Sequence, residues 1–304
     1  MTQTNDPLAN DPLAPARSLI NAGELDAAVA ELDRVLDGPT YTPGAFLLRS
    51  QCYAHGQGSA LLMALHNAEA EHAMNPDLPG LSGHLANLQA ALAGQRGPSA
   101  PAQREWATAL DANTINHLEL CSQRHTYRSI PMIKNVFDLA LYPRLLWETK
   151  PRTIIEIGSF YGGSAVWMAD LTGGFGLDTH VYSVDINKVW AAKHDRVTFI
   201  QGSGRELENV FSDDFLAALP RPWLVIEDAD HSFETTTAVL NFFHDRLRPG
   251  EYVIVEDGMT SPPALQGLQQ FLARHPNEYD VDPDYCDHFG KNLTWCVNGF
   301  LRRR

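Results

Sequence analysis

The fold is decided by the stretch RTIIEIGSFYGGSA, residues 152–165, in which an apolar run passes through a glycine turn into a helical pattern. The run is continuous and rich in isoleucine, which is typical of a strand buried on both faces. Gly158 and Gly162 allow the backbone to approach a ligand closely, and the start of the following helix presents free N–H groups. The stretch therefore predicts a strand, a turn and a helix that meet at a ligand.

Four more short apolar stretches follow the same pattern, and helical patterns such as residues 235–247 separate them. The four stretches are HVYSVDI (180–186), VTFIQGS (197–203), PWLVIEDA (222–229) and EYVIVEDG (251–258). Buried strands that alternate with helices predict a parallel sheet in an α/β sandwich. Ligands of such sheets bind beyond the carboxyl ends of the strands, so the strand ends are where we expect the site.

The first three strand ends predict a nucleoside pocket. Asp185 lies 27 residues beyond Gly158, where an acid can accept hydrogen bonds from both ribose hydroxyls. Neither a GxGxxG turn nor a GxxxxGK[ST] loop is present, so S-adenosylmethionine fits better than NAD or ATP. A plain tight turn and a helix cap are the alternatives. The expected cofactor-binding residues are Glu156, Gly158, Gly162, Ser164, Asp185, Gly202, Ser203 and Asp228.

The fourth and fifth strand ends carry acids. Asp228, Glu256 and Asp257 can converge in one crevice, where three carboxylates repel one another unless a cation lies between them. An all-oxygen set favours Mg²⁺ or another hard divalent ion. His231, three residues after Asp228, is a candidate general base because its ordinary pKa suits proton acceptance near neutral pH. Solvated loop acids and a capping histidine remain the alternatives.

The front of the chain has a different pattern. Residues 1–15 repeat NDPLA and predict a mobile tail, whereas apolar residues at three- and four-residue steps predict helices over residues 16–93. Pro39 and Pro76 end two helical runs 37 residues apart, which is compatible with a tetratricopeptide-like pair or with ordinary helical hairpins. We expect a linker and a connecting helix over residues 94–123 and the α/β domain over residues 124–304.

Composition limits the classes of partner. The 304 residues carry a formal net charge of −14, which argues against nucleic acid and anionic membrane surfaces as partners. The four cysteines have no CxxC spacing, and they predict reduced thiols in a cytoplasmic protein. No basic leader with an apolar core and no run of about 18 apolar residues occurs, so neither secretion nor a membrane span is expected.

From about Arg124 onward, the sequence resembles the family of cephalosporin hydroxylases and rhamnosyl O-methyltransferases, which includes metal-dependent macrolide sugar O-methyltransferases. The resemblance covers roughly 180 residues, and its combination of pieces is more specific than any one of them. The matching pieces are IPMIKNVFDLALYPRLLWETKPRTIIEIGSFYGGSAVWMADL, YSVDI, DADHS, LRPGEYVIVEDG and CDHFGKNLTWCVNGFLRR.

The resemblance implies a Rossmann-like class I methyltransferase with a mainly parallel seven-stranded sheet and S-adenosylmethionine as cofactor. It also implies magnesium held by Asp228, Glu256 and Asp257, with His231 as the base. The expected reaction is methylation of a hydroxyl on a small acceptor, such as a sugar on an antibiotic-like natural product. Larger relatives carry N-terminal additions, so the helical domain could assemble a homo-oligomer or bind a protein partner.

Two alternatives remain open at this point. The same fold could methylate a β-lactam, a phenol or a peptide side chain, with Tyr127, Arg128 and Lys134 either closing over the acceptor or lying in a surface loop. Alternatively, the second half could be an inactive scaffold whose helical domain binds a protein. The presence of the glycine turn and of all three strand-end acids argues against an inactive protein.

Overall fold

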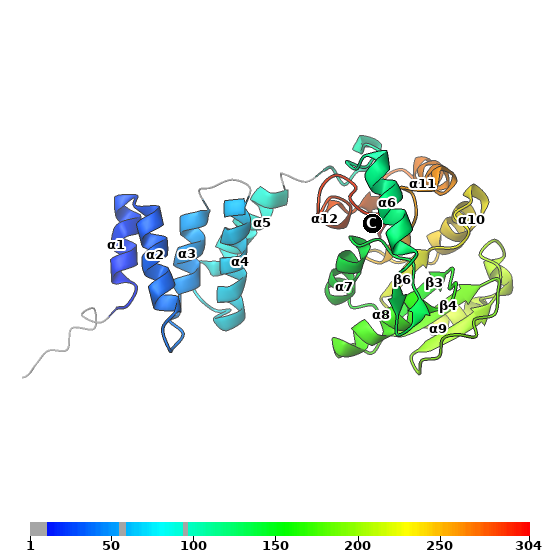
Figure 1. Cartoon of the computed structure of the whole chain (residues 1–304), viewed down its shortest axis with the longest axis horizontal. Coiled ribbons are helices and arrows are strands. Elements are labelled where there is room, and N and C mark those ends of the chain that lie inside the picture. Colours follow the sequence, from blue (N-terminus) through cyan, green and yellow to red (C-terminus); the bar gives the residue numbers. More distant parts are fainter. Residues whose placement is uncertain (1–10, 55–58, 94–96) are drawn as a thin grey trace, which may run out of the picture. The chain divides into compact units, whose positions relative to one another are not determined.

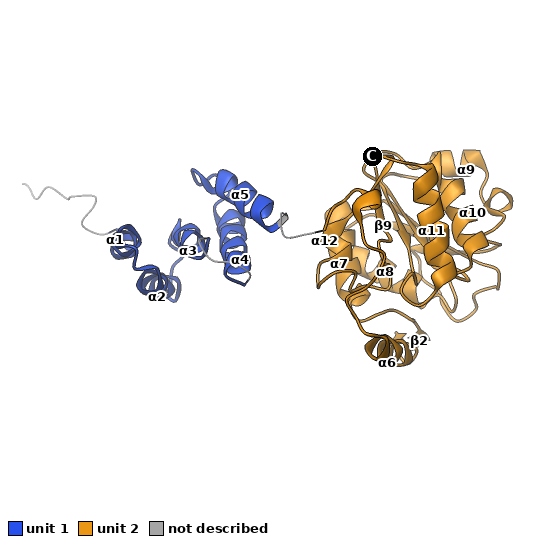
Figure 2. Cartoon of the chain, turned by 90° about the horizontal axis from the view of Figure 1, so that it is seen from above, with its two compact units in different colours: residues 1–96 blue, residues 97–304 orange. Residues whose placement is uncertain are grey.

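The computed structural model describes residues 11–54, 59–93 and 97–304. The chain forms two compact units, residues 1–96 and residues 97–304 (Figure 2). Most of the predicted mobile tail, residues 1–10, lies outside the described residues, as do residues 94–96 of the predicted linker. The predicted domain boundaries at residues 15, 93 and 123 remain a prediction.

The described part of the first unit is helical (Figure 1). Its helices are α1 (Ala14–Ala22), α2 (Leu25–Leu36), α3 (Ala45–Tyr53), α4 (Ser59–Met74) and α5 (Leu81–Ala93). One apolar cluster forms around Leu32 and a second forms around Leu81. Helices α2 and α4 end just before Pro39 and Pro76, as their positions predict. The helical prediction is confirmed, whereas tetratricopeptide-like packing remains a prediction.

A buried acid organises the middle of the first unit. Glu71, on α4, is fully buried and accepts hydrogen bonds from the N–H groups of Gly44 at 2.8 Å, Phe46 at 3.1 Å and Leu47 at 3.3 Å. Its Oε1 also accepts one from the hydroxyl of Tyr41. Because Gly44 precedes α3, the carboxylate supplies acceptors to N–H groups that the helix cannot pair internally. Glu71 thus fastens α4 to the start of α3.

The second unit is built on a seven-stranded sheet of order β5-β4-β3-β6-β7-β9-β8. Every pairing from β5 to β7 is parallel, and β9 is antiparallel to both of its neighbours. The strands are β3 (Thr153–Ile157), β4 (His180–Asp185), β5 (Val197–Gln201), β6 (Trp223–Glu227), β7 (Tyr252–Val255), β8 (Tyr279–Val281) and β9 (Phe300–Arg303). The predicted α/β sandwich with a mainly parallel sheet is confirmed.

Helices cover this sheet on both faces. In Figure 2, α7 and α8 lie on one side of the strands, while α10 and α11 pack together on the other. The helices are α6 (Ala112–Ser122), α7 (Asp138–Thr149), α8 (Gly163–Gly174), α9 (Asp213–Ala218), α10 (Phe233–His244), α11 (Pro262–Arg274) and α12 (Pro283–Cys286). A short hairpin, β1 (Thr126–Tyr127) and β2 (Ile130–Pro131), precedes α7. Among the helices of the described ranges, none combines the length and apolar character that a membrane span requires.

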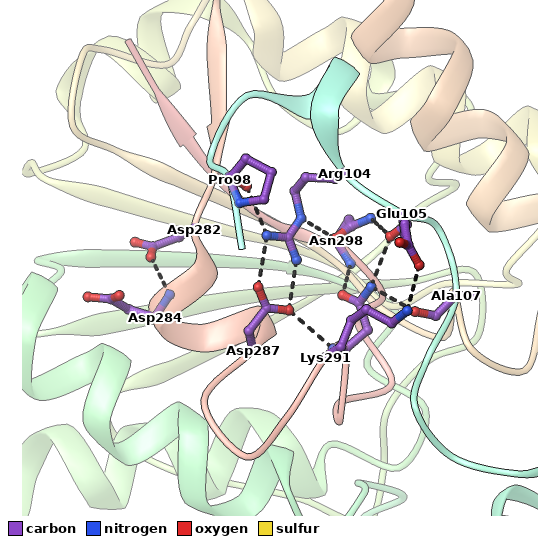
Figure 3. A network of polar contacts seen from close by, with 10 residues as sticks. Pro98, Arg104, Glu105, Ala107, Asp282, Asp284, Asp287, Lys291 and Asn298 are labelled. Carbon is purple, nitrogen blue, oxygen red and sulfur yellow. Dashed lines mark hydrogen bonds and ion pairs between the residues drawn. The ribbon is translucent and has the colours of Figure 1, made fainter. Parts of the chain in front are cut away.

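The segment after residue 96, which composition predicts to be a linker, is fastened to the second unit (Figure 3). The guanidinium of Arg104 donates two parallel hydrogen bonds of 2.9 Å to the carboxylate of Asp287 and a third to Asn298. The side chain of Arg104 is only 3% exposed. The backbone N–H of Val281 also donates to the carbonyl of Ser99 at 2.9 Å. Residues 97–104 are therefore part of the folded unit.

The order of the strands places a crevice at the centre of the sheet. From β3 the chain proceeds outward through β4 to β5, and it then returns to β6 on the other side of β3. Gly158 follows β3 at φ +111°, and a Cβ atom there would lie 1.8 Å from the carbonyl oxygen of Asp228. Only glycine allows the two strand ends to approach so closely, and ligands bind at such a switch point.

Candidate active site

Two adjoining cavities open at the carboxyl ends of the parallel strands. Cavity A, of about 490 Å³, lies over the ends of β3, β4 and β5 and includes Asp185 and Gly202 in its lining. Cavity B, of about 300 Å³, lies toward β7 and includes His231 and Asp257. The two cavities share a wall made by Gly158, Phe160, Asp228 and Ala229. Asp228 therefore adjoins both cavities.

Cavity A gathers most of the residues predicted to bind a nucleoside. Gly158, Asp185, Gly202 and Ser203 line it together with Asp228. The carboxylate of Asp185 accepts hydrogen bonds from the N–H groups of Phe160 and Asn187, each at 2.8 Å. These bonds hold the carboxylate at the end of β4. The arrangement has the acid and the close backbone approach that a ribose site requires.

Three of the predicted cofactor residues take other positions. Glu156 lines neither cavity, since it lies two residues before the glycine at the end of β3 and is fully buried. It accepts hydrogen bonds from the hydroxyls of Ser164 and Ser183, and burial raises its pKa to about 7. Gly162 precedes α8 at φ +87°, where a Cβ would lie 2.7 Å from the ring of Phe199. Ser164 lines cavity B instead of cavity A.

Cavity B contains a cluster of metal-type side chains. Asp228, His231 and Asp257 each offer a ligand atom, and these atoms all lie within 4.8 Å of one another. Nε2 of His231 lies 3.4 Å from Oδ2 of Asp257, while Nδ1 is buried and has no hydrogen-bond partner within the described structure. His231 and Asp257 have left-handed backbones, with φ of +52° and +59°, which are strained for residues other than glycine.

Glu256 adjoins this cluster through a lysine. It is 1% exposed, and its Oε1 accepts hydrogen bonds from the ammonium of Lys134 and the hydroxyl of Tyr142. The same ammonium donates to Oδ2 of Asp228 at 2.6 Å. The structure thus brings the three predicted acids into one region, but it pairs Glu256 with Lys134 and groups His231 with Asp228 and Asp257.

The electrostatics of the cluster favour a bound cation. Burial raises the pKa of Asp228, Glu256 and Asp257, and neighbouring carboxylates add to each increase. Burial alone would lower the pKa of His231, but Asp257 and then Asp228 outweigh it and raise that pKa above its ordinary value. When ionised, three carboxylates and one ammonium leave two net negative charges. Oxygen donors with this charge fit a hard divalent ion.

Sequence reasoning missed the burial of Lys134 and did not single out Tyr142 and Glu119. Lys134 was expected on an acceptor loop, yet it is 2% exposed and paired with two strand-end acids. The available signal was that it is the only charged residue in the apolar stretch SIPMIKNVF, residues 129–137. The other two predicted loop residues, Tyr127 and Arg128, both donate to Asp170 at 3.0 Å, and neither lines cavity A or B.

A second group of metal-type side chains lies elsewhere in the unit. His244, His275 and Glu278 come together where α10 and α11 end. Glu278 is already paired with Arg303 at 2.8 Å, and none of the three residues lines cavity A or B. The strand-end cluster is therefore the candidate site.

Comparisons with known proteins agree with this fold. The model of the family Rhamnosyl O-methyltransferase/CmcI matches residues 120–304. The rhamnosyl O-methyltransferase of Mycobacterium leprae (strain TN) is 28% identical over 200 residues, which cover 59% of this chain and 83% of that protein. The rhamnosyl O-methyltransferase of Mycobacterium bovis (strain BCG / Pasteur 1173P2) is 29% identical, with 59% and 78% covered.

Two solved structures agree with the same assignment. The structure titled "cmcI-D160 Mg-SAM" has a TM-score of 0.51 and 28% identity, and the match covers 60% of this chain and 77% of that one. The structure titled "CmcI-N160 apo-structure" has a TM-score of 0.51 and 26% identity, with 60% and 76% covered. The chain belongs to the Rhamnosyl O-methyltransferase/CmcI family, and it is an S-adenosylmethionine-dependent O-methyltransferase. The predicted family and enzyme class are confirmed.

Proposed function

We propose that this chain transfers a methyl group from S-adenosylmethionine in cavity A to a hydroxyl of an oxygen-rich acceptor, such as a sugar on a natural product, in cavity B. The observation that carries the proposal is the wall that the two cavities share at Gly158 and Asp228. The predicted cofactors, S-adenosylmethionine and Mg²⁺, are confirmed by the family and by the related structure whose title contains both. The identity of the acceptor is our proposal.

Residues at the strand ends would hold the two cofactors. Asp185 would accept hydrogen bonds from the ribose hydroxyls, and Gly158 would leave space for the ligand against the backbone. Asp228, Asp257 and Glu256 are the carboxylates that would hold Mg²⁺, as the sequence predicts. When bound, S-adenosylmethionine supplies an electrophilic methyl group and Mg²⁺ supplies a Lewis acid that lowers the pKa of a hydroxyl.

His231 is the proposed general base. His231 lines cavity B and its Nε2 faces Asp257, so that carboxylate can stabilise the imidazolium that forms when His231 takes the acceptor's proton. In the reaction, the carbon–sulfur bond breaks, a carbon–oxygen bond forms and the hydroxyl proton passes to His231. The products are a methyl ether and S-adenosylhomocysteine.

The lining of cavity B supports an acceptor with several hydroxyls. Met132, Ile133 and Phe160 form its apolar part. Glu119, from α6, contributes a carboxylate whose Oε2 is buried and has no hydrogen-bond partner in the described parts of the chain. A buried acceptor atom of this kind costs free energy unless a ligand donates to it. A sugar in cavity B would place hydroxyls near the carboxylate of Glu119 and its apolar ring face against the apolar part of the wall.

A product assay tests the proposal. The protein is incubated with S-adenosylmethionine, Mg²⁺ and a panel of rhamnosides, other deoxysugar glycosides, phenols and β-lactams, and products are detected by a mass gain of one methylene. We expect gain on a glycoside, loss of activity in EDTA and recovery with added Mg²⁺. Methylation confined to phenols or β-lactams would overturn the acceptor class, and full activity in EDTA would overturn the metal role.

A further inference from the structure

The ammonium of Lys134 lies where a cation of the carboxylate cluster is expected. It lies 2.6 Å from Oδ2 of Asp228 and 2.5 Å from Oε1 of Glu256. Lys134 belongs to the loop between β2 and α7, so a segment that precedes the whole parallel sheet supplies the cation to the ends of β6 and β7. Its side chain is 1% exposed, and the aromatic ring of Tyr142 lies 5.5 Å from the ammonium.

Because Lys134 and the acids that it contacts are buried, each charge depends on the other for its stability. A buried ammonium is strongly unfavourable unless it is paired and hydrogen-bonded, and the same is true of the carboxylates it meets. Asp228 lines both cavities, whereas Glu256 lines neither. Lys134 therefore links the cavity residue Asp228 to the buried residue Glu256. The oxygens that Lys134 occupies belong to two of the three residues proposed to hold Mg²⁺. A divalent ion that uses these oxygens must displace the ammonium or share them with it.

We propose that Lys134 is a positioning residue that serves as the cation of the carboxylate cluster in the metal-free enzyme and competes with the divalent ion for Asp228 and Glu256. This inference rests on the proposed function, because it assumes that the cluster is the metal site. Lys134 would keep the acids together between metal-binding events, and it would make the bound metal easier to release. Its removal should therefore weaken the metal-free fold and strengthen metal binding.

The test uses the full chain and metal ions alone. The Lys134→Met variant keeps most of the side-chain volume and removes the charge, while Lys134→Gln is a second neutral variant that retains a hydrogen-bond donor. Lys291→Met is the matched control, because Lys291 forms an ion pair with Glu105 but its side chain is 47% exposed and away from both cavities. Metal affinity is measured by calorimetric titration with Mg²⁺ and Mn²⁺, and thermal unfolding is followed in EDTA and in excess metal.

In EDTA, we expect Lys134→Met to lower the melting temperature of the second unit by about 10 °C, as unpaired buried carboxylates require. Both neutral variants should bind Mn²⁺ at least about tenfold more tightly than the wild type, because the competing positive charge is gone. Metal should also raise their melting temperatures more than it raises that of the wild type. Lys291→Met should match the wild type in all three measurements.

Two different failures can be separated. If the wild type binds metal and the neutral variants bind it equally or more weakly, the competition is overturned while the proposed function stands. If neither the wild type nor any variant binds metal, the metal role in the proposed function is overturned as well. If Lys134→Met does not fold, Lys134→Gln decides the comparison.

Discussion

Glu71 of the first unit and Glu256 of the second are both buried, but their carboxylates are stabilised in different ways. In the first unit, Glu71 is surrounded by backbone N–H groups and one tyrosine hydroxyl, all of them uncharged. In the second unit, Glu256 meets the ammonium of Lys134, which also binds a cavity acid. Fixed neutral donors make a buried acid part of the scaffold. A shared cation links a buried acid to a site where another cation can bind.

The largest effect should come from removing an acid of the cluster. Asp257→Asn removes the charge and keeps the left-handed backbone at φ +59°, since asparagine tolerates that conformation. We expect kcat/KM to fall by about 10³-fold and metal titration to show much weaker binding. The matched control is Asp178→Asn, because Asp178 is exposed and pairs with Arg152, and neither residue lines cavity A or B. Equal losses in the two variants would contradict the assignment of Asp257.

The next largest effect should come from the neutralised acid of the first unit. Glu71→Ala leaves the N–H groups at the start of α3 without their acceptor, so the first unit should lose about 3 kcal/mol of stability. All six tryptophans lie in residues 97–304, so their fluorescence reports on the second unit alone. In chemical denaturation, Glu71→Ala should move the transition seen by circular dichroism to a lower denaturant concentration. It should leave the fluorescence transition and metal binding unchanged. Glu71→Gln is the milder control variant.

A smaller effect is expected from pH in the metal-free protein. Burial raises the pKa of Asp138, Glu156 and Glu227 in the second unit to about 7 each. Between their unfolded values near 4 and this value, the folded state binds more protons than the unfolded state, so stability falls as pH rises. We expect the fluorescence-detected melting temperature to fall between pH 5 and pH 8, with most of the loss below pH 7. A flat or rising profile would contradict these raised pKa values.

The smallest effect should come from the ribose acid in cavity A. Asp185→Asn weakens the acceptor offered to the ribose hydroxyls while retaining its shape, so the Kd of S-adenosylhomocysteine should rise about tenfold. Asp195→Asn, at an exposed acid after the same strand, is the control and should not change the affinity. Calorimetric titration measures both values. The affinity for metal should stay at the wild-type level in each variant.

The sequence predicted the parts of the site that depend on local pattern. Buried parallel strands are continuous apolar runs, so all five parallel strands and the acids at the ends of β4, β6 and β7 could be located from the residues. The strands β8 and β9 are short and antiparallel at the edge, and their existence followed only from the family resemblance. Glu156 was expected at the pocket because it is close to the glycine turn. Its position inside the strand directs it into the core instead.

Long-range pairing could not be predicted. Lys134 is 94 residues from Asp228 and 122 from Glu256, and Arg104 is 183 residues from Asp287. No local periodicity connects such pairs, since each depends on how the sheet and its loops close in space. Composition therefore indicated a surface loop for Lys134 and a linker around Arg104, whereas tertiary contacts bury both side chains.

The ion pair between Arg104 and Asp287 determines where this chain can be cut into fragments for experiments. The match to the family begins at residue 120, yet the folded unit begins about twenty residues earlier. Ser99 and Arg104 both form hydrogen bonds with the rest of that unit. A fragment that starts at residue 120 would remove Arg104, the ion-pair partner of Asp287. It would also expose the surface that residues 97–104 cover. The family match and the folded unit of this enzyme therefore start at different residues.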